Sequence, residues 1–266
     1  MMIDKGRMDK PYYKTDTTTL LKGDSLELLK EIEDNSIDLI FADPPYFLSN
    51  DGISCKSGKM VSVNKGDWDK IDNYDEIENF NHLWLKESQR ILKPNGCIWV
   101  SGTHHNIYSV GNQLKILGYK ILNVITWEKP NPPPNLSCRY FTHSTEQVIW
   151  ASKNIKSKHK FNYPLMREIN GGKQMKDVWT FTSPPKSEKK FGKHPTQKPL
   201  KLLNRIITSS TDEGDIVLDP FNGSGTTGIE SIRLNRKYIG IDIEDGFLDL
   251  TISRLKDEED LFTKVN

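Results

Sequence analysis

The stretch IVLDPFNGSGTTG, residues 216–228, sets the fold class of this 266-residue chain. A short β-branched run ends at Asp219, a glycine-containing loop follows, and a helix-forming run begins at Thr226. Glycines at such a place allow a tight strand-to-helix turn and let the backbone approach a ligand closely. A second strand is expected to end at Asp242, 19 residues after Gly223, where an acid can accept hydrogen bonds from a ribose diol.

Strand-like and helix-like segments alternate along most of the chain. This alternation predicts an α/β fold with a doubly wound, mostly parallel sheet covered by helices. Residues 1–12 are predicted to be disordered, and residues 52–70 and 152–193 lack either period, which is typical of functional loops or insertions. The expected strands are 37–42, 97–101, 121–127, 147–151, 216–219 and 238–242, and the expected helices are 25–33, 74–92, 202–210 and 226–234.

The glycine pattern Gly223-x-Gly225-x-x-Gly228 fits two classes of cofactor site. Together with the later acid it matches the dinucleotide fingerprint. A dinucleotide would bring a pyrophosphate against the loop, however, and the Asp219 carboxylate would repel it. S-adenosyl-L-methionine has no phosphate and carries an ammonium and a sulfonium, which the same carboxylate would attract. Charge therefore favours S-adenosyl-L-methionine, and an NAD-dependent oxidoreductase remains the alternative.

A second motif, Asp43-Pro44-Pro45-Tyr46, directly follows the buried-strand pattern 37–42. Adjacent prolines end a central strand and fix the backbone, so the Asp43 carboxylate and the Pro44 carbonyl would be held rigidly at the carboxyl edge of the sheet. Two acceptors there can hold an exocyclic amine, and Tyr46 offers a face on which a base can stack, as enzymes acting on extruded bases require. A plain turn is the alternative interpretation.

Asp24 also has two interpretations. Glu27 follows it by three residues, which is typical of a capping arrangement at a helix start. Because Asp24 also ends an apolar run, it can lie near a cofactor at the same sheet edge. The two roles are compatible.

The net charge of +1 hides an uneven distribution. Residues 152–193 contain 11 Lys or Arg and only three acids, the footprint expected of a phosphate-binding element. We expect DNA contacts from Lys153, Lys156, Lys158 and Lys160. The alternative is a solvated surface loop.

The three cysteines, Cys55, Cys97 and Cys138, argue against several chemistries. They have no CxxC or paired-His spacing, which disfavours a disulfide framework and a structural zinc site, and we expect no metal. None follows a proline, which disfavours the covalent thiol route of C5-cytosine methylation. No run of apolar residues is long enough to cross a membrane, so a cytoplasmic protein is expected.

The order of these motifs resembles the β-group amino-methyltransferases of bacterial restriction–modification systems. In that group the DPPY element comes first, a target-recognition region follows, and the FxGxG element, here Phe221-x-Gly223-x-Gly225, comes last. The segments HPTQKP (194–199) and LKPNG (92–96) look like further elements of the group. The stretches DPPYFLSN (43–50) and NLSCRYFTHSTE (135–146) are similar to the second adenine methyltransferases of DpnII-type systems.

The resemblance implies a circularly permuted class I S-adenosylmethionine-dependent methyltransferase fold. A catalytic and cofactor domain would comprise 13–151 and 194–266, with 152–193 as an inserted target-recognition region. The implied reaction is methylation of N6 of adenine in DNA at GATC, with N4-cytosine methylation, usually signalled by Ser at position 43, as the alternative. A cognate restriction endonuclease and a homodimer are also implied. The implied site residues are Asp43, Pro44 and Tyr46 for catalysis, and Asp24, Asp219, Phe221, Gly223, Gly225, Thr226, Asp242, His194 and Lys198 for the cofactor.

Overall fold

A nine-stranded sheet forms the centre of the protein, whose computed structural model describes residues 10–46, 53–56, 59–62, 73–192 and 194–265. The strand order is β1-β2-β11-β10-β3-β6-β8-β7-β9. Strands β2, β11, β10, β3 and β6 run parallel, and β8 lies antiparallel between β6 and β7. The predicted α/β fold with a mostly parallel sheet is confirmed.

The sheet strands are β1 (Tyr13–Lys14), β2 (Thr18–Lys22), β3 (Ile37–Ala42), β6 (Leu92–Gly102), β7 (Lys120–Glu128), β8 (Thr145–Ser152), β9 (Val178–Thr180), β10 (Ile216–Asp219) and β11 (Lys237–Asp242). A separate hairpin pairs β4 (Ile53–Lys56) with β5 (Lys59–Ser62). The helices are α1 (Ser25–Glu31), α2 (Tyr74–Ile91), α3 (Ile107–Ile116), α4 (Tyr163–Ile169), α5 (Leu200–Ser210), α6 (Thr226–Arg233) and α7 (Asp245–Val265), with a 3-10 turn η2 (Lys186–Lys189). Among the described residues, no helix has the length and apolar character needed to cross a membrane.

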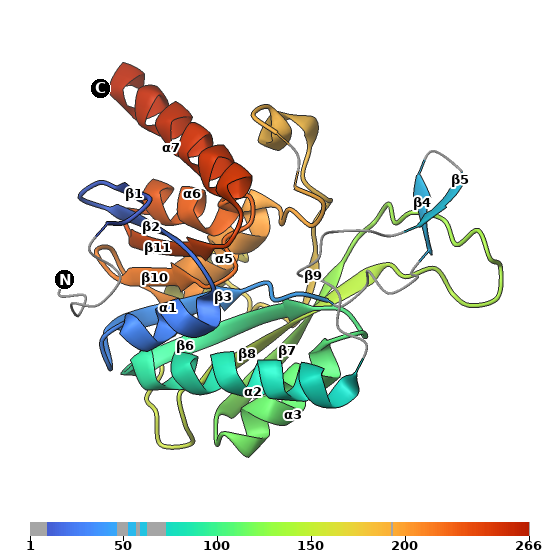
Figure 1. Ribbon diagram of the computed structural model, residues 1–266, viewed down its shortest axis with the longest axis horizontal. Helices are drawn as coiled ribbons and strands as arrows, with labels where there is room; N and C mark the ends of the chain where they lie inside the picture. Colours follow the sequence, from blue (N-terminus) through green and yellow to red (C-terminus); the bar gives the residue numbers. More distant parts are fainter. Residues whose placement is uncertain (1–9, 47–52, 57–58, 63–72, 193, 266) are drawn as a thin grey trace.

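Two hydrophobic cores cover the two faces of the sheet, as the two-residue period of a strand requires. Along β3, Ile40 and Ala42 join the core formed with α1, α2 and α3, whereas Leu39 and Phe41 join the core formed with α5. Figure 1 shows α2 and α3 together on one side of the sheet and α5, α6 and α7 toward the other. Strands buried on both faces explain the near-continuous apolar run in β3.

This topology brings the polar strand ends together. The parallel strands β2, β11, β10 and β3 all finish at one edge of the sheet. The antiparallel strand β8 starts at that same edge, because Gly102 at the end of β6 pairs with Gln147 near its beginning. Residues that follow the parallel strands, or that begin β8, are therefore neighbours in space.

The basic segment 152–193 is built into this sheet and does not stand apart from it. Strand β9 pairs in parallel with β7, and Trp179 is buried with its ring 5.9 Å from that of Trp99. The expectation of a segment without regular structure is wrong for α4 and β9. A three-residue edge strand and a seven-residue helix are too short to display a period.

The two other segments predicted to be irregular lie partly outside the described residues. Of the N-terminal stretch 1–12, residues 1–9 lie outside them, and Tyr12 is placed by a 2.8 Å hydrogen bond from its hydroxyl to Asp249. Within 52–70, the described parts form the β4–β5 hairpin.

Candidate functional site

A cavity of about 260 Å³ opens at the carboxyl edge of the sheet. It is lined by segments far apart in sequence: Gly23–Ser25 after β2, Asp43–Tyr46 after β3, the loop after β10, Asp242 at the end of β11, and parts of 194–198 before α5. Every predicted catalytic and cofactor residue lines it except Gly225. The structure thus brings together the motifs that the sequence shows separately.

Gly225 serves the fold instead of the cavity. It precedes α6 with φ of 71°, a left-handed conformation that glycine adopts at little cost. A Cβ atom there would lie 2.4 Å from Cγ2 of Thr251, so the glycine lets α7 pack against the loop. The next residue, Thr226, is buried and its hydroxyl accepts a 3.1 Å hydrogen bond from Arg254.

A buried acid, Asp219, and a partly buried one, Asp242, frame the glycine loop. Asp219 is 2% exposed and accepts hydrogen bonds from the Phe221 amide at 3.0 Å and the Thr227 hydroxyl at 2.6 Å. Asp242 accepts from the Gly223 amide at 2.7 Å and the Glu244 amide at 3.0 Å. Burial raises the pKa of Asp219 to about 7 and that of Asp242 to about 6, against the hydrogen bonds that favour ionisation.

Asp24 lies both at the start of a helix and beside the cavity, as predicted. Its carboxylate accepts from the Leu26 amide at 2.8 Å and so caps α1. The same residue lines the cavity. The neighbouring Ser25 hydroxyl donates to the carbonyl of Pro220, which ties the start of α1 to the glycine loop.

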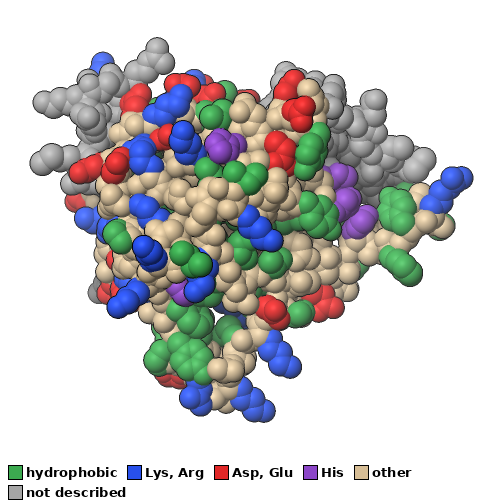
Figure 2. All heavy atoms as spheres, turned by 90° about the horizontal axis from the view of Figure 1, so that it is seen from below, with side chains coloured by type: hydrophobic (Ala, Val, Ile, Leu, Met, Phe, Trp, Pro, Cys, Tyr) green, Lys and Arg blue, Asp and Glu red, His purple; other side chains and the backbone are tan. Residues whose placement is uncertain are grey.

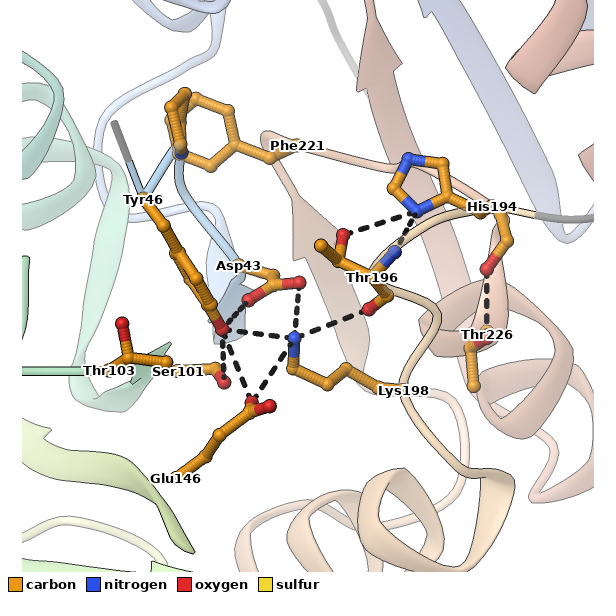
Figure 3. Close-up of polar contacts among 12 residues, drawn as sticks. Asp43, Tyr46, Ser101, Thr103, Glu146, His194, Thr196, Lys198, Phe221 and Thr226 are labelled. Carbon is orange, nitrogen blue, oxygen red and sulfur yellow. Dashed lines mark hydrogen bonds and ion pairs between the residues drawn. The ribbon is translucent and has the colours of Figure 1, made fainter. Parts of the chain in front are cut away.

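Asp43 is fixed by two donors, as Figure 3 shows. Lys198 Nζ donates to one carboxylate oxygen at 2.5 Å, and the Tyr46 hydroxyl donates to the other at 2.6 Å. The Lys198 ammonium also donates to the Tyr46 hydroxyl at 3.0 Å. A carboxylate oxygen has more than one acceptor site, so Asp43 can still accept hydrogen bonds from a ligand.

Lys198 is only 5% exposed and stands between two carboxylates. Glu146, at the start of β8, lies 3.6 Å from its ammonium on the side away from Asp43. Burial opposes the lysine's charge, but Asp43 and Glu146 outweigh it and raise the pKa of Lys198. Glu146 also pairs with Lys129. These partners lower the pKa of Glu146 although burial acts to raise it.

Glu146 is the member of this cluster that sequence reasoning did not single out. It is the last residue of the NLSCRYFTHSTE stretch. The signal was a carboxylate next to a run of buried residues, Val148–Ala151. Such a charge is retained in an apolar strand only when it is paired.

Aromatic side chains complete the cavity wall. The Phe221 ring meets that of Trp84 edge-on at 5.5 Å and lies 6.0 Å from that of Phe80. The His194 ring meets that of Phe247 edge-on at 4.4 Å, and its Nδ1 lies 3.2 Å from the Thr196 hydroxyl. These contacts hold Phe221 and His194 in place on either side of the glycine loop.

The four lysines predicted to contact DNA are not part of this site. The Lys160 amide bonds the carbonyl of Asn95 near the start of β6, which places 153–160 at the opposite edge of the sheet. Lys153 Nζ donates to Asn35 Oδ1 at 2.6 Å and to the Leu92 carbonyl at 2.5 Å. Lys160 pairs with two aspartates, Asp212 and Asp215.

These bonds give Lys153 and Lys160 a structural role, which the count of basic residues could not reveal. Lys156 and Lys158 are exposed at the same edge. All four lysines for which DNA contacts are predicted therefore lie at the opposite end of the strands from the cavity.

Comparison with known proteins agrees with the geometry. The family model described as DNA methylase, of the N6 and N4 type, matches residues 37–253. The type II methyltransferase M2.LlaDCHI of Lactococcus lactis subsp. cremoris is 59% identical over 93% of both chains. M2.DpnII of Streptococcus pneumoniae is 56% identical over 95% of both. The solved complex of M1.HpyAVI with SAM superimposes with a TM-score of 0.66 at 30% identity, covering 90% of this chain and 98% of that one. The chain belongs to the N6/N4 DNA methylase family.

Proposed function

We propose that this protein transfers a methyl group from S-adenosyl-L-methionine to N6 of adenine in DNA, as the modification enzyme of a type II restriction–modification system. The observation that best supports this function is that a single cavity is lined by both the acidic glycine loop and the Asp43–Tyr46 turn. The first suits a cationic cofactor, and the second suits an exocyclic amine. Relatives that are type II methyltransferases over nearly their whole length support the same reaction.

The charge of the cavity fits S-adenosyl-L-methionine better than NAD. Among the described residues that line it, five are acidic (Asp24, Asp43, Asp219, Asp242 and Glu244) and the single lysine, Lys198, is already paired. A pyrophosphate would meet repulsion here, whereas an ammonium and a sulfonium would be attracted. When bound, the cofactor supplies an electrophilic methyl group. Asp242 would accept hydrogen bonds from the ribose diol, and Phe221 would stack on the adenine ring.

Asp43 would act on the target amine. The amino nitrogen of adenine is a poor nucleophile because its lone pair is delocalised into the ring. Hydrogen bonds from its NH2 group to Asp43 and to the Pro44 carbonyl favour a tetrahedral nitrogen with the lone pair aimed at the methyl group. Lys198 and Tyr46 hold the carboxylate in place before the base arrives, which is preorganisation of the kind that lowers a barrier.

The identity of the methylated base is directly testable. DNA incubated with the purified protein and methyl-labelled S-adenosyl-L-methionine should yield labelled N6-methyladenine after hydrolysis to nucleosides. Sequencing of modified bases should then place the label in one short sequence, for which we propose GATC. Labelled N4-methylcytosine would refute the adenine assignment, and tight NAD binding without methyl transfer would refute the whole function.

We propose that the enzyme acts in the bacterial cytoplasm, where its DNA substrate would lie. Its proposed functional partner is a cognate restriction endonuclease that cleaves the same sequence when unmethylated. Contact between the two proteins is not required, because both act through DNA. A homodimer stays a prediction.

Asp242→Ala should weaken S-adenosyl-L-methionine binding by about 1.5–3 kcal/mol, the range for a hydrogen bond to a charged group. The variant removes the proposed diol acceptor and the bond that orders the Gly223 amide. Calorimetric titration measures the affinity. Asp245→Ala is the control, since Asp245 is half-exposed in an ion pair with Lys22 just beyond the cavity. Equal affinities for the two variants would remove Asp242 from the cofactor site.

Cofactor binding should weaken as the pH falls from about 8 to about 5, because protonating Asp219 and Asp242 removes their attraction for a cation. Burial raises their pKa values to about 7 and about 6, so the loss falls within this window. The stability of the free protein has the opposite sign. Raised carboxyl pKa values mean that the folded state binds more protons, so these groups cost stability as the pH rises through the same window. Cofactor titration over the pH range measures how the affinity depends on pH, and thermal unfolding measures how the stability does. Asp219→Asn should weaken both dependences. A cofactor affinity that does not change with pH would contradict the prediction.

A further inference from the structure

The loop between β7 and β8, residues 129–144, forms an arm that exposes an unusual amount of apolar surface. Figure 1 shows it extending beyond the sheet, on the same side as the β4–β5 hairpin. Phe141 is 96% exposed, the highest value among the large hydrophobic side chains that the structure describes, and its neighbour Tyr140 is 60% exposed. Single exposed hydrophobic residues are common, so the position and rigidity of the arm must decide whether this one matters.

The arm is stiff. Pro130 and the run Pro132–Pro134 restrict its backbone. At its far end the Asn135 side chain closes the turn, because its amide donates to the Tyr140 carbonyl at 2.5 Å and its oxygen accepts from the Ser137 amide at 3.0 Å. At its base the Lys129 amide donates to the Ser144 carbonyl at 2.8 Å. A side chain carried on such a restrained backbone loses little backbone entropy on contact with a partner.

The base of the arm is joined to the catalytic cluster. Lys129 pairs with Glu146, whose carboxylate lies 3.6 Å from the Lys198 ammonium. His143 of the arm stacks on His104 with ring centroids 4.7 Å apart. Asn106, two residues after His104, donates from its Nδ2 to the Pro45 carbonyl at 3.5 Å. The base of the arm therefore lies beside the part of the cavity that holds Asp43.

The surface of the arm has the character of a nucleic-acid contact. Burial, aided by His143, lowers the pKa of His104, which favours the neutral ring, and this ring offers an aromatic surface stacked on His143. On the face drawn in Figure 2, histidines gather beside hydrophobic side chains, with Lys or Arg further out on the projecting part. Exposed Arg139 directly precedes Tyr140 and can reach a phosphate. The exposed rings of Tyr140 and Phe141 are flanked by the polar residues Arg139 and Thr142, a pattern that suits a base stack flanked by phosphates better than a continuous protein interface.

We propose that Phe141 is a wedge that stacks on the bases next to the target adenine when that adenine leaves the duplex. This rests on the proposed function, DNA adenine methylation. Removing a base from a duplex costs stacking and pairing energy, and an apolar side chain inserted at the vacated step recovers part of it. Beside Phe141 in the sequence, the Tyr140 ring packs against His143, which stacks on His104, so further aromatic surface lies next to the proposed wedge.

The wedge has a specific kinetic signature. The substrates are two synthetic duplexes that carry the enzyme's target sequence in unmethylated form. One is fully paired, and the other has an abasic site opposite the target adenine. Phe141→Ala should slow single-turnover methylation of the paired duplex by about ten- to hundredfold, the range that one aromatic–base stack supplies. On the abasic duplex, where the adenine is already unpaired, the same variant should stay within about twofold of wild type. Phe141→Trp should retain activity on both.

Ile155→Ala is the matched control. Ile155 is 76% exposed at the opposite edge of the sheet, and its loss should affect neither substrate. Equal slowing of Phe141→Ala on both duplexes would overturn the wedge, and so would an unchanged rate of this variant on the paired duplex. Either result would leave DNA methylation itself intact. A wild-type protein that methylates neither duplex would instead refute the proposed function.

Discussion

Asp43→Asn should reduce methyl transfer more than about a hundredfold, comparable to losing one preorganised group that stabilises a transition state. The amide keeps the size of the carboxylate but presents an NH2 donor where the target amine needs an acceptor. It also removes the charge that Lys198 holds at 2.5 Å. Single-turnover methylation of DNA measures the effect. S-adenosyl-L-methionine affinity should stay within several-fold of wild type, because Asp219 and Asp242 are untouched.

Two results define the limits of this prediction. Asp245→Asn, at an exposed ion pair, should leave turnover unchanged. An Asp43→Asn protein that keeps more than a tenth of wild-type turnover would show that Asp43 does not act on the amine.

Much of the fold was predictable because its central strands are buried on both faces. The apolar run 37–42 matches β3 residue for residue, and 216–219 matches β10. In both cases an acid and a turn-forming segment mark where the strand ends. Because parallel strands end at one edge, placing the strands was enough to predict that Asp43, Asp219 and Asp242 would meet.

What the sequence did not reveal depends on contacts between distant residues. Glu146 and Lys198 are 52 positions apart, and only the fold brings Glu146 to within 3.6 Å of the ammonium. Helices α3 and α7 were not predicted, and neither was β9, whose three residues pair with β7 through tertiary packing. The lysines of 153–160 were grouped by charge alone, which cannot distinguish a phosphate contact from Lys153 bonding the Leu92 carbonyl.

Lys198→Met should have two large effects, because it leaves the largely buried carboxylates of Asp43 and Glu146 without the cation between them. Removing one partner of a buried ion pair costs about 3–5 kcal/mol, so the free energy of unfolding should fall by that order. Turnover should also fall more than about a hundredfold, because Asp43 loses one of the two donors that fix it. Urea unfolding and single-turnover methylation measure the two effects separately.

A second substitution separates stability from positioning. Adding Glu146→Gln to Lys198→Met removes one of the two buried carboxylates and should recover part of the lost stability, but not the turnover, since Asp43 remains without its lysine. Lys93→Met is the matched control at the opposite edge of the sheet, where Lys93 pairs with the buried Asp38 at 2.7 Å. It should lower stability and spare turnover. If the double variant regained activity together with stability, Lys198 would serve only to neutralise Glu146, and the orientation of Asp43 would have to come from Tyr46 alone.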